Sequence, residues 1–221
     1  MIVNNESQIA FGYELRKAQE EKESKEVVDA LAGSTVAICG LGGLGSNIAM
    51  MLSRAGIGRL ILTDFDTVNI TNLHRQFYKI NQLDMKKAWA LSDNLAEIAP
   101  LTRVELHDEK ISPDRIKELL ADADVICEAF DNAEQKAMLV GTVLEVFPDT
   151  DLVAASGMAG TGDANDIITR QISEHFYLCG DFHTDVGEAD SLLPSRVMVC
   201  AAHQAHKIIQ LLIHKKAAAN N

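Results

Sequence analysis

The chain has 221 residues, of which 47% are hydrophobic and 24% are charged, a balance typical of a folded globular protein and not of a disordered or fibrous one. Its 32 acidic and 20 basic residues give a formal net charge of −12, so nucleic acid and membrane surfaces are poor partners. The four cysteines are scattered and form no C-x-x-C pair, which argues against a disulfide scaffold and predicts no zinc site. These features, and an N-terminus without a secretion signal, favour a reduced, cytoplasmic environment.

The N-terminal part predicts a helical extension over residues 1–33. Residues 6–32 are rich in Glu, Lys, Gln and Ala with loosely spaced apolar positions, which indicates one or two surface helices. From residue 34 onward we expect a single domain that runs to residue 221. Its longest uncharged run, 36–53, contains four glycines and predicts a strand, a turn and a helix, not a membrane span.

Short apolar runs then alternate with helical stretches. The expected strands are 35–39, 60–63, 103–106, 125–129 and 152–155, and the expected helices are 44–55, 85–98, 113–120 and 133–147. Because strands that alternate with helices of this length require crossover connections, the pattern predicts an α/β fold with a doubly wound, mostly parallel, Rossmann-like sheet.

The alternation ends near residue 156. We expect a loop over residues 157–166. Residues 167–172 and 176–179 are predicted to form short strands of an antiparallel hairpin. An acidic segment, 180–193, shows no periodicity. The last helix is expected from Pro194, a residue suited to the first helical position, to about His214, with a frayed tail over 215–221.

A glycine-rich turn follows the first expected strand and opens a helix. Its glycines are Gly40, Gly42, Gly43 and Gly45. Glycines at this place allow a tight turn and let a phosphate approach the backbone at the positive end of the helix. Such turns also exist only to pack a helix on a sheet, but the strand-to-helix context favours nucleotide binding.

A polar segment follows the second expected strand. Asp64 lies 19 residues after Gly45, where a dinucleotide-binding fold places an acid on a ribose, so a dehydrogenase would fit equally well up to this point. The segment 64–76 then adds Asp66, an amide and Arg75 beside the expected phosphate site. An arginine there neutralises a group that gains negative charge in a reaction, which favours phosphoryl or nucleotidyl transfer. The alternative is a solvated loop with an incidental ion pair.

Gly-x-Gly-Gly-x-Gly followed by Asp-x-Asp-x-Val and Asn-Leu-x-Arg-Gln resembles the ThiF/MoeB/HesA superfamily, which includes the ubiquitin-activating enzymes, from about residue 35 to 153. Members adenylate the C-terminal glycine of a small ubiquitin-fold protein with ATP. The short chain and the runs 128–133 and 177–181 look most like the compact ThiF branch of thiamine biosynthesis. The resemblance implies ATP and Mg²⁺ as cofactors, a ThiS-like sulfur-carrier protein as partner, a homodimer, and a carrier-facing region from about residue 157.

The resemblance also implies roles for individual residues. Asp64 matches the acid that binds the ribose, and Asp66 matches a second acid of the nucleotide pocket. A phosphate-binding loop is matched by Asn72, Arg75 and Gln76. Of these, Arg75 is expected to take part in catalysis, and the glycines of the turn are expected to bind the nucleotide.

Two further positions complete the expected site. The family motif Gly-x-Pro-Lys is degraded here, so Lys87 is assigned as the catalytic lysine and Lys86 stays the alternative. Asp131 matches the family aspartate that holds Mg²⁺. The strand 125–129 independently places it at the carboxyl edge of the sheet, where a single carboxylate with substrate phosphates is enough for Mg²⁺. The plainer interpretation is that Asp131 and Asn132 cap the next helix.

Other features depart from the family. Arg16 is the best match for an arginine that reaches into a partner's site, although Lys17 or a plain surface salt bridge is as good an interpretation. Some relatives use a cysteine after adenylation, but the matching stretch, 185–193, has none. Cys179 lies upstream and is a possible nucleophile, while a small buried strand residue is the more common reading.

The leading hypothesis is an ATP-dependent adenylyltransferase acting on the C-terminus of a sulfur carrier. A nucleotide-binding scaffold without adenylation activity is the alternative suggested by the degraded lysine motif. A relative that adenylates an RNA-linked carboxylate is disfavoured by the net charge of −12. An NAD-dependent oxidoreductase is the alternative outside the family.

Overall fold

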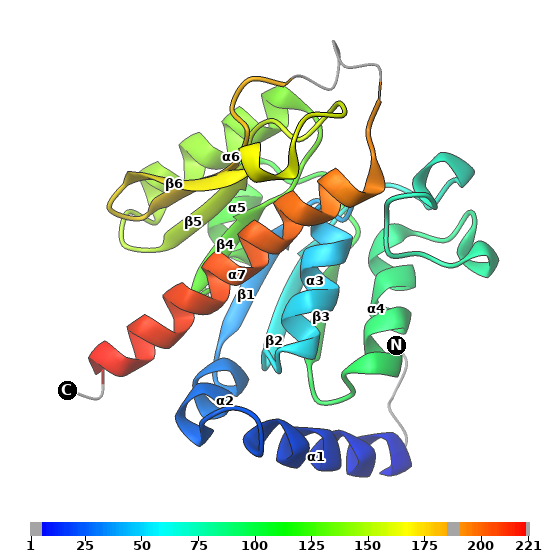
Figure 1. Cartoon of the computed structure of the whole chain (residues 1–221), viewed down its shortest axis with the longest axis vertical. Helices are drawn as coiled ribbons and strands as arrows, with labels where there is room; N and C mark the ends of the chain where they lie inside the picture. Colours follow the sequence, from blue (N-terminus) through cyan, green and yellow to red (C-terminus); the bar gives the residue numbers. More distant parts are fainter. Residues whose placement is uncertain (1–5, 185–190, 220–221) are drawn as a thin grey trace.

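A seven-stranded sheet forms the centre of the protein, whose computed structural model describes residues 6–184 and 191–219 (Figure 1). The strand order is β3-β2-β1-β4-β5-β7-β6, and all neighbouring pairs are parallel except β6 with β7. The strands are β1 (Thr35–Cys39), β2 (Arg59–Thr63), β3 (Arg103–His107), β4 (Val125–Glu128), β5 (Asp151–Ala155), β6 (Ile168–Ser173) and β7 (Phe176–Gly180). The predicted Rossmann-like, mostly parallel sheet is therefore confirmed.

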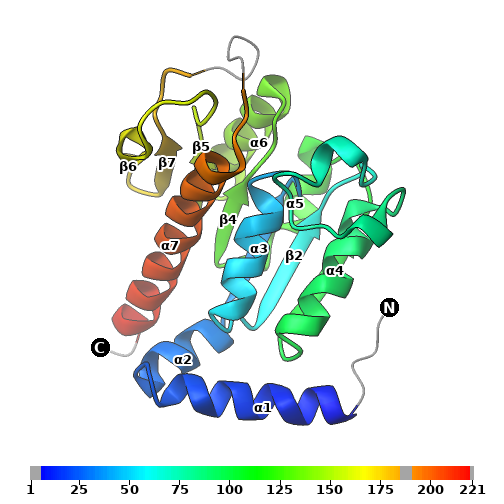
Figure 2. The same ribbon diagram turned by 45° about the vertical axis from the view of Figure 1, so that its right-hand side comes forward.

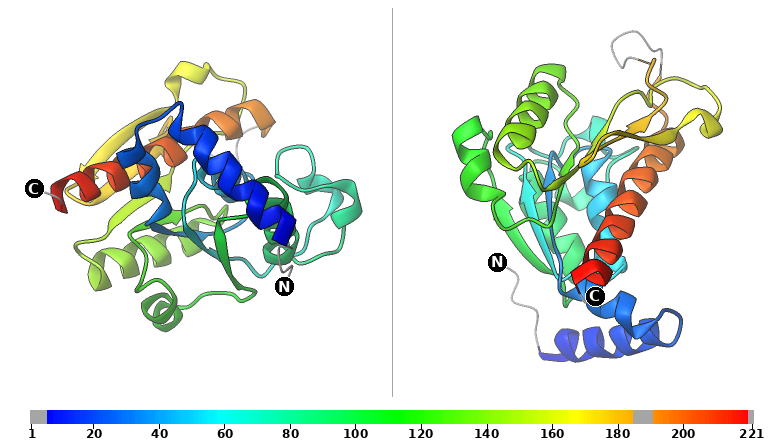
Figure 3. Two further views of the ribbon diagram at one scale, coloured as in Figure 1. Left: turned by 90° about the horizontal axis from the view of Figure 1, so that it is seen from below. Right: turned by 90° about the vertical axis from the view of Figure 1, so that its left-hand side faces the viewer.

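Helices cover both faces of this sheet. They are α1 (Glu6–Glu20), α2 (Lys25–Ala32), α3 (Gly45–Arg54), α4 (Lys87–Ile98), α5 (Pro113–Leu119), α6 (Ala133–Val146) and α7 (Pro194–Ala219). Figure 2 and the right-hand view of Figure 3 show α3, α4 and α7 on one face and α5 and α6 on the other. The central strands β1 and β4 are buried and, apart from Thr35 and Glu128 at their ends, apolar, because helices cover them from both sides.

The N-terminal helices lie at the end of the sheet where the parallel strands begin (Figure 1). Arg16 joins α1 to α2 through a 2.8 Å hydrogen-bonded ion pair with Asp29 and also lies 3.7 Å from Glu20. Within one copy of the chain this is the surface salt bridge that the sequence allowed. A role for Arg16 in a partner's site stays a prediction, as does a domain boundary near residue 33.

The elements begin and end close to the predicted residues, with one clear exception at the C-terminus. The prediction of a frayed tail is wrong for residues 215–219, because α7 continues without a break through His214 to Ala219. Lysine and alanine are strong helix formers, and Lys215 lies 3.8 Å from Asp124, so the last turns are favoured both locally and by charge. In the described part of the chain, no helix combines the length and the apolarity needed to cross a membrane.

A buried ion pair fixes the segments that precede α7. Arg196, in the first turn of α7, lies 2.7 Å from Asp181, which directly follows β7. The same guanidinium donates to the backbone carbonyls of Ala159, Gly162 and Asp163 in the loop after β5. One side chain thus joins three segments that are far apart in the sequence.

Hydrogen bonds hold the Asp181 carboxylate in its charged form. Burial alone would raise the pKa of this group, but backbone N–H donors from Thr184 and His183, the Thr184 hydroxyl and the Arg196 guanidinium outweigh it and hold the pKa well below its usual range. A depressed pKa in the folded state stabilises the fold above the unfolded value. This stabilisation is lost as the pH falls toward the folded value.

We expect Asp181→Asn to lower the free energy of unfolding at pH 7 by about 3 kcal/mol, because it leaves a buried guanidinium without its charge partner. The advantage of the wild-type protein over the variant should shrink progressively as the pH falls below about 4, where the unfolded carboxyl becomes protonated and the folded one does not. Urea unfolding at pH 7 and below about pH 4 measures the difference in the free energy of unfolding between the two proteins. Asp29→Asn, which breaks exposed pairs with Arg16 and Lys25, is the matched control and should change stability far less. An equal loss in the two variants would contradict this role for Asp181.

Candidate functional site

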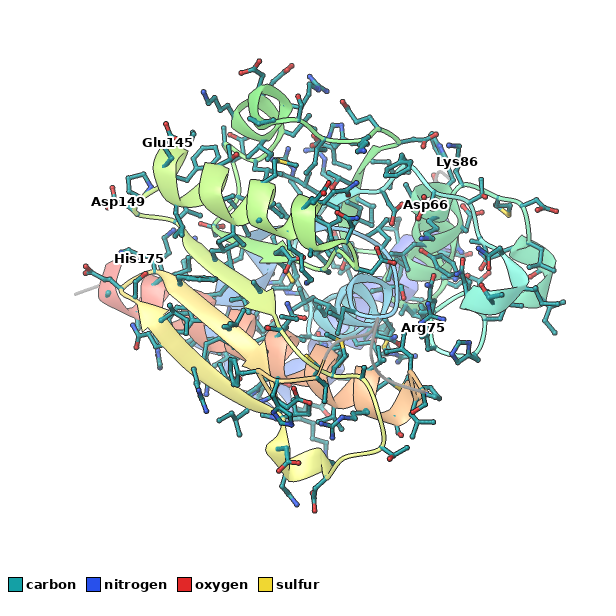
Figure 4. The ribbon with its side chains drawn as sticks, turned by 90° about the horizontal axis from the view of Figure 1, so that it is seen from above. Asp66, Arg75, Lys86, Glu145, Asp149 and His175 are labelled. Atoms are coloured by element: carbon teal, nitrogen blue, oxygen red, sulfur yellow. The ribbon has the colours of Figure 1, made fainter. Side chains whose placement is uncertain are left out.

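A cavity of about 520 Å³ opens at the carboxyl ends of the parallel strands. This is the edge at which ligands bind in open α/β sheets. The predicted site residues that line it are Gly40, Gly42, Gly43, Asp64, Asp66, Arg75, Gln76, Lys87 and Asp131. Figure 4 views the molecule from this end and labels Asp66, Arg75 and Lys86, all from the segment between β2 and α4.

The glycines of the glycine-rich turn serve two purposes: some allow close packing and others leave space for a ligand. Gly40 has a φ of +93°, and a Cβ there would lie 2.7 Å from the Ala129 carbonyl oxygen. A Cβ on Gly45 would lie 1.8 Å from the Gly40 oxygen, so Gly45 serves the close packing of turn and helix and does not line the cavity. Gly42 and Gly43 do line it, and among the residues described their backbone N–H groups have no partner. Free N–H groups at the start of α3 form a site for an anion.

Asp64 ties this turn to the segment after β2. Its carboxylate accepts hydrogen bonds from the backbone N–H of Leu41 at 2.7 Å and of Asp66 at 2.8 Å, and lies 3.8 Å from the ammonium group of Lys87. Burial raises the pKa of the Asp64 carboxyl, while the Lys87 charge acts in the opposite direction. The acid expected to bind a ribose is therefore held rigidly at the wall of the cavity.

The two adjacent lysines have separate environments. Lys87 is 6% exposed, lies at the start of α4 and forms a 2.7 Å ion pair with Asp66 inside the cavity. Lys86 is exposed and binds the Phe65 carbonyl oxygen and Asp108, at 2.8 and 3.1 Å. Only Lys87 of the two lines the cavity, which supports its assignment over Lys86.

Arg75 and Asp131 line the same cavity from different segments. The Arg75 guanidinium donates to the Thr71 carbonyl oxygen of its own loop at 2.8 Å. Burial lowers the pKa of Arg75, and the charge of Asp131 opposes this effect. Asp131 itself is exposed, and no hydrogen bond or ion pair to it is found in the parts of the chain described. The capping role belongs to Asn132, which accepts from the Gln135 N–H at 3.0 Å.

The geometry also tests whether the expected cofactors fit. No group of three or more His, Cys, Asp or Glu side chains that could hold a metal is present in the described residues, so Mg²⁺ would need phosphate and water oxygens beside Asp131. The Oε1 atom of Gln76 is buried without a partner beside the cavity and is available as an acceptor. Asn72, in contrast, does not line the cavity, because its Oδ1 accepts from the Asn69 N–H and closes a local turn.

Sequence reasoning missed a buried ion pair at the back of the cavity. Lys136 of α6 lines the cavity, and its ammonium group lies 2.9 Å from Glu128 and 3.1 Å from the Ala155 carbonyl oxygen. Glu128 also accepts from the Phe130 N–H at 2.7 Å, which shapes the turn that carries Asp131. The available signal was a glutamate at the end of an otherwise apolar strand, followed eight residues later by a lysine.

Cys179 is not placed for nucleophilic chemistry. It lies on β7 with no exposed surface, its Sγ is 3.3 Å from the Thr169 hydroxyl, and it does not line the cavity. Burial raises its pKa to about 11, so the thiolate is scarce at neutral pH. The packing interpretation is favoured by this geometry. Cys39, Cys127 and Cys200 are buried as well.

We expect none of the four thiols of the folded protein to react with iodoacetamide at pH 7, since all are buried and a thiol with a raised pKa presents little thiolate. Intact-mass spectrometry measures the number of adducts, and the same reaction in guanidinium chloride should label all four. Rapid native labelling at Cys179 alone would contradict the buried placement and restore it as a nucleophile.

A model of the ThiF family matches residues 15–221 of the chain. The chain is 29% identical over 150 residues to the sulfur carrier protein ThiS adenylyltransferase of Escherichia coli K12, a match covering 67% of this chain and 59% of that protein. It is 34% identical to ubiquitin-like modifier-activating enzyme 5 of Caenorhabditis briggsae over 59% of this chain and 29% of the relative. The matches thus span less than two thirds of the length of each of these relatives.

Solved structures share the fold at low sequence identity. The tRNA N6-threonylcarbamoyladenosine dehydratase of E. coli, in complex with ATP, superposes with a TM-score of 0.84 at 18% identity and covers 98% of this chain and 99% of that one. E. coli MccB with ATP gives 0.68 at 20% identity, over 86% and 58%. These likenesses support the fold, and the family match extends over nearly the whole sequence. The chain belongs to the ThiF family.

Proposed function

We propose that the protein is an ATP-dependent adenylyltransferase that activates the C-terminal glycine carboxylate of a small ubiquitin-fold sulfur-carrier protein. The observation that carries this proposal is the convergence of Arg75, Lys87 and the N–H groups of Gly42 and Gly43 on one cavity that Asp131 also lines. The two N–H groups and the Asp131 carboxylate have no partner among the described residues. This is more positive charge than a diphosphate of a hydride-transfer cofactor requires. It suits a triphosphate that loses pyrophosphate.

Each part of the cavity has a role in this proposal. Asp64 binds the ribose, Asp66 lies beside it, and the turn with Gln76 and Arg75 holds the phosphates. Asp131 would hold Mg²⁺, which supplies charge neutralisation for the phosphates when bound. Lys87 exchanges its ion pair with Asp66 for a contact to phosphate when the nucleotide enters. This exchange keeps the lysine ordered in both states.

The chemistry needs no general base. A C-terminal carboxyl has a pKa of about 3.3 to 3.7, so it is already ionised at neutral pH. One of its oxygens bonds to the α-phosphorus of ATP while the bond to the pyrophosphate oxygen breaks, giving an acyl-adenylate. Catalysis then consists of alignment of the carboxylate and of stabilisation of the leaving pyrophosphate by Arg75 and Lys87.

The carrier class rests on similarity to the ThiS adenylyltransferase of E. coli, which matches 67% of this chain. We also propose that the protein acts in thiamine biosynthesis, as a homodimer in the cytoplasm. The dehydratase with the similar fold acts, by its name, on tRNA. A substrate linked to RNA is the second candidate, and the net charge of −12 argues against it.

We expect ATP–pyrophosphate exchange that depends on a ThiS-type carrier ending in Gly-Gly. Arg75→Ala, Lys87→Ala and Asp131→Asn should each lower the exchange rate by about 100-fold, because each removes charge stabilisation from the transition state. The neighbouring Lys86→Ala is the matched control and should stay within about threefold of wild type, since its exposed pair with Asp108 contributes little.

Three outcomes would contradict the proposal in different ways. Equal losses in the Lys86 and Lys87 variants would remove the assignment of Lys87. Tight ATP binding with no exchange for any carrier tested would favour the nucleotide-binding scaffold. ATP cleavage that requires tRNA at moderate salt, and not a carrier, would establish the RNA-linked substrate.

A further inference from the structure

The segment that carries Arg75 is fastened to the glycine-rich turn by polar side chains at the start of α3. Figure 2 shows the loop between β2 and α4 beside this end of the helix. We infer that Asn47 is a positioning residue for Arg75 and that Ser46 supports it, an inference that rests on the proposed function. Neither residue lines the cavity.

Asn47 joins the two segments through a single amide group. Its Nδ2 atom donates to the Gly43 carbonyl oxygen at 2.7 Å and to the Arg75 carbonyl oxygen at 2.9 Å. An amide nitrogen has two hydrogens, so both donors are used. The side chain is 1% exposed, and water cannot readily replace it. Asn47 is therefore a direct link between the turn and the backbone of Arg75 itself.

Ser46 makes a parallel connection one residue earlier. Its hydroxyl donates to the Gly42 carbonyl oxygen at 2.6 Å and accepts from the Phe77 N–H at 3.0 Å. The Tyr78 hydroxyl adds a third link, to the Leu41 carbonyl oxygen at 2.8 Å. The carbonyl oxygens of the turn are thus occupied by side chains of α3 and of the loop. The N–H groups of Gly42 and Gly43, which have no partner among the described residues, are left for a ligand.

The Arg75 side chain has no comparable anchor of its own. In the described residues its hydrogen bonds go to Thr71 and His74, both within the same loop. Its stem passes close to Gly43, where a Cβ would lie 3.5 Å from the Arg75 Cγ atom. The position of the guanidinium relative to the turn consequently depends on the backbone link through Asn47. A small displacement of a charge-stabilising group is costly in catalysis.

A double-mutant cycle with Arg75→Ala tests this dependence. We expect Asn47→Ala to weaken binding of ATP with Mg²⁺ by about 10-fold, because the loss of its two buried hydrogen bonds releases the Arg75 backbone from the turn. The KM for ATP in pyrophosphate exchange should rise as well. In the Arg75→Ala background, Asn47→Ala should have almost no further effect. A merely structural role would lower the amount of folded enzyme and leave the Kd for ATP unchanged.

The control is Thr102→Val, which removes a side-chain hydrogen bond to the Ile57 carbonyl oxygen, 2.9 Å long, at the far end of the sheet. It should leave the ATP affinity unchanged. If Asn47→Ala does not fold by circular dichroism, Ser46→Ala takes its place in the cycle. Its control is then Ser34→Ala, which removes a serine hydrogen bond to a backbone carbonyl four residues earlier, that of Ala30, away from the cavity.

If the loss of ATP affinity in the double variant equals the product of the losses in Asn47→Ala and Arg75→Ala, the two residues act independently and the positioning role is overturned. An unchanged affinity in the folded Asn47→Ala protein would overturn it as well. A wild-type protein that binds ATP but gives no exchange would contradict the proposed function alone, because the cycle can still be read in binding. A wild-type protein that binds no ATP would contradict both.

Discussion

The candidate site depends on the buried carboxylate of Asp64. This group joins the glycine-rich turn, through the Leu41 N–H, to the loop after β2 and to the start of α4, through Lys87. A buried carboxylate is costly unless it is hydrogen-bonded and paired, and here the two backbone donors and the lysine satisfy it. Because these partners come from three segments, the charge that is expensive to bury also fixes their relative positions.

Two other ion pairs near the site also hold the ends of strands together. Glu128 and Lys136 hold the ends of β4 and β5 and the turn that presents Asp131. Farther along, Arg196 and Asp181 hold the loop after β5 against the start of α7. Ion pairs therefore hold in place the segments that surround the cavity. The side of the turn that faces a ligand keeps unpaired N–H groups, and Asp131 stays unpaired among the described residues.

The fold could be predicted from the sequence because the buried strands are short apolar runs and the helices between them are periodic, as the burial of β1 and β4 shows. The family resemblance likewise pointed to the turn and to Lys87, which the structure brings to one cavity and whose roles stay predictions. The sequence could not show that Gly45 serves packing or that Asn72 closes a local turn, since both depend on the exact backbone conformation of a short segment. Nor could it show that Cys179 contacts β6 and α7, since that depends on contacts between distant segments. The roles of Asn47 and Lys136 were hidden because both look like ordinary helix residues.

The most direct test of this account is a crystal structure of the protein with Mg²⁺ and α,β-methylene ATP, which cannot transfer its adenylyl group. The account predicts the phosphates within hydrogen-bonding distance of the Gly42 and Gly43 N–H groups, with the guanidinium of Arg75 beside them and Lys87 turned from Asp66 toward a phosphate. Phosphates bound elsewhere, with the pair between Lys87 and Asp66 intact, would contradict it.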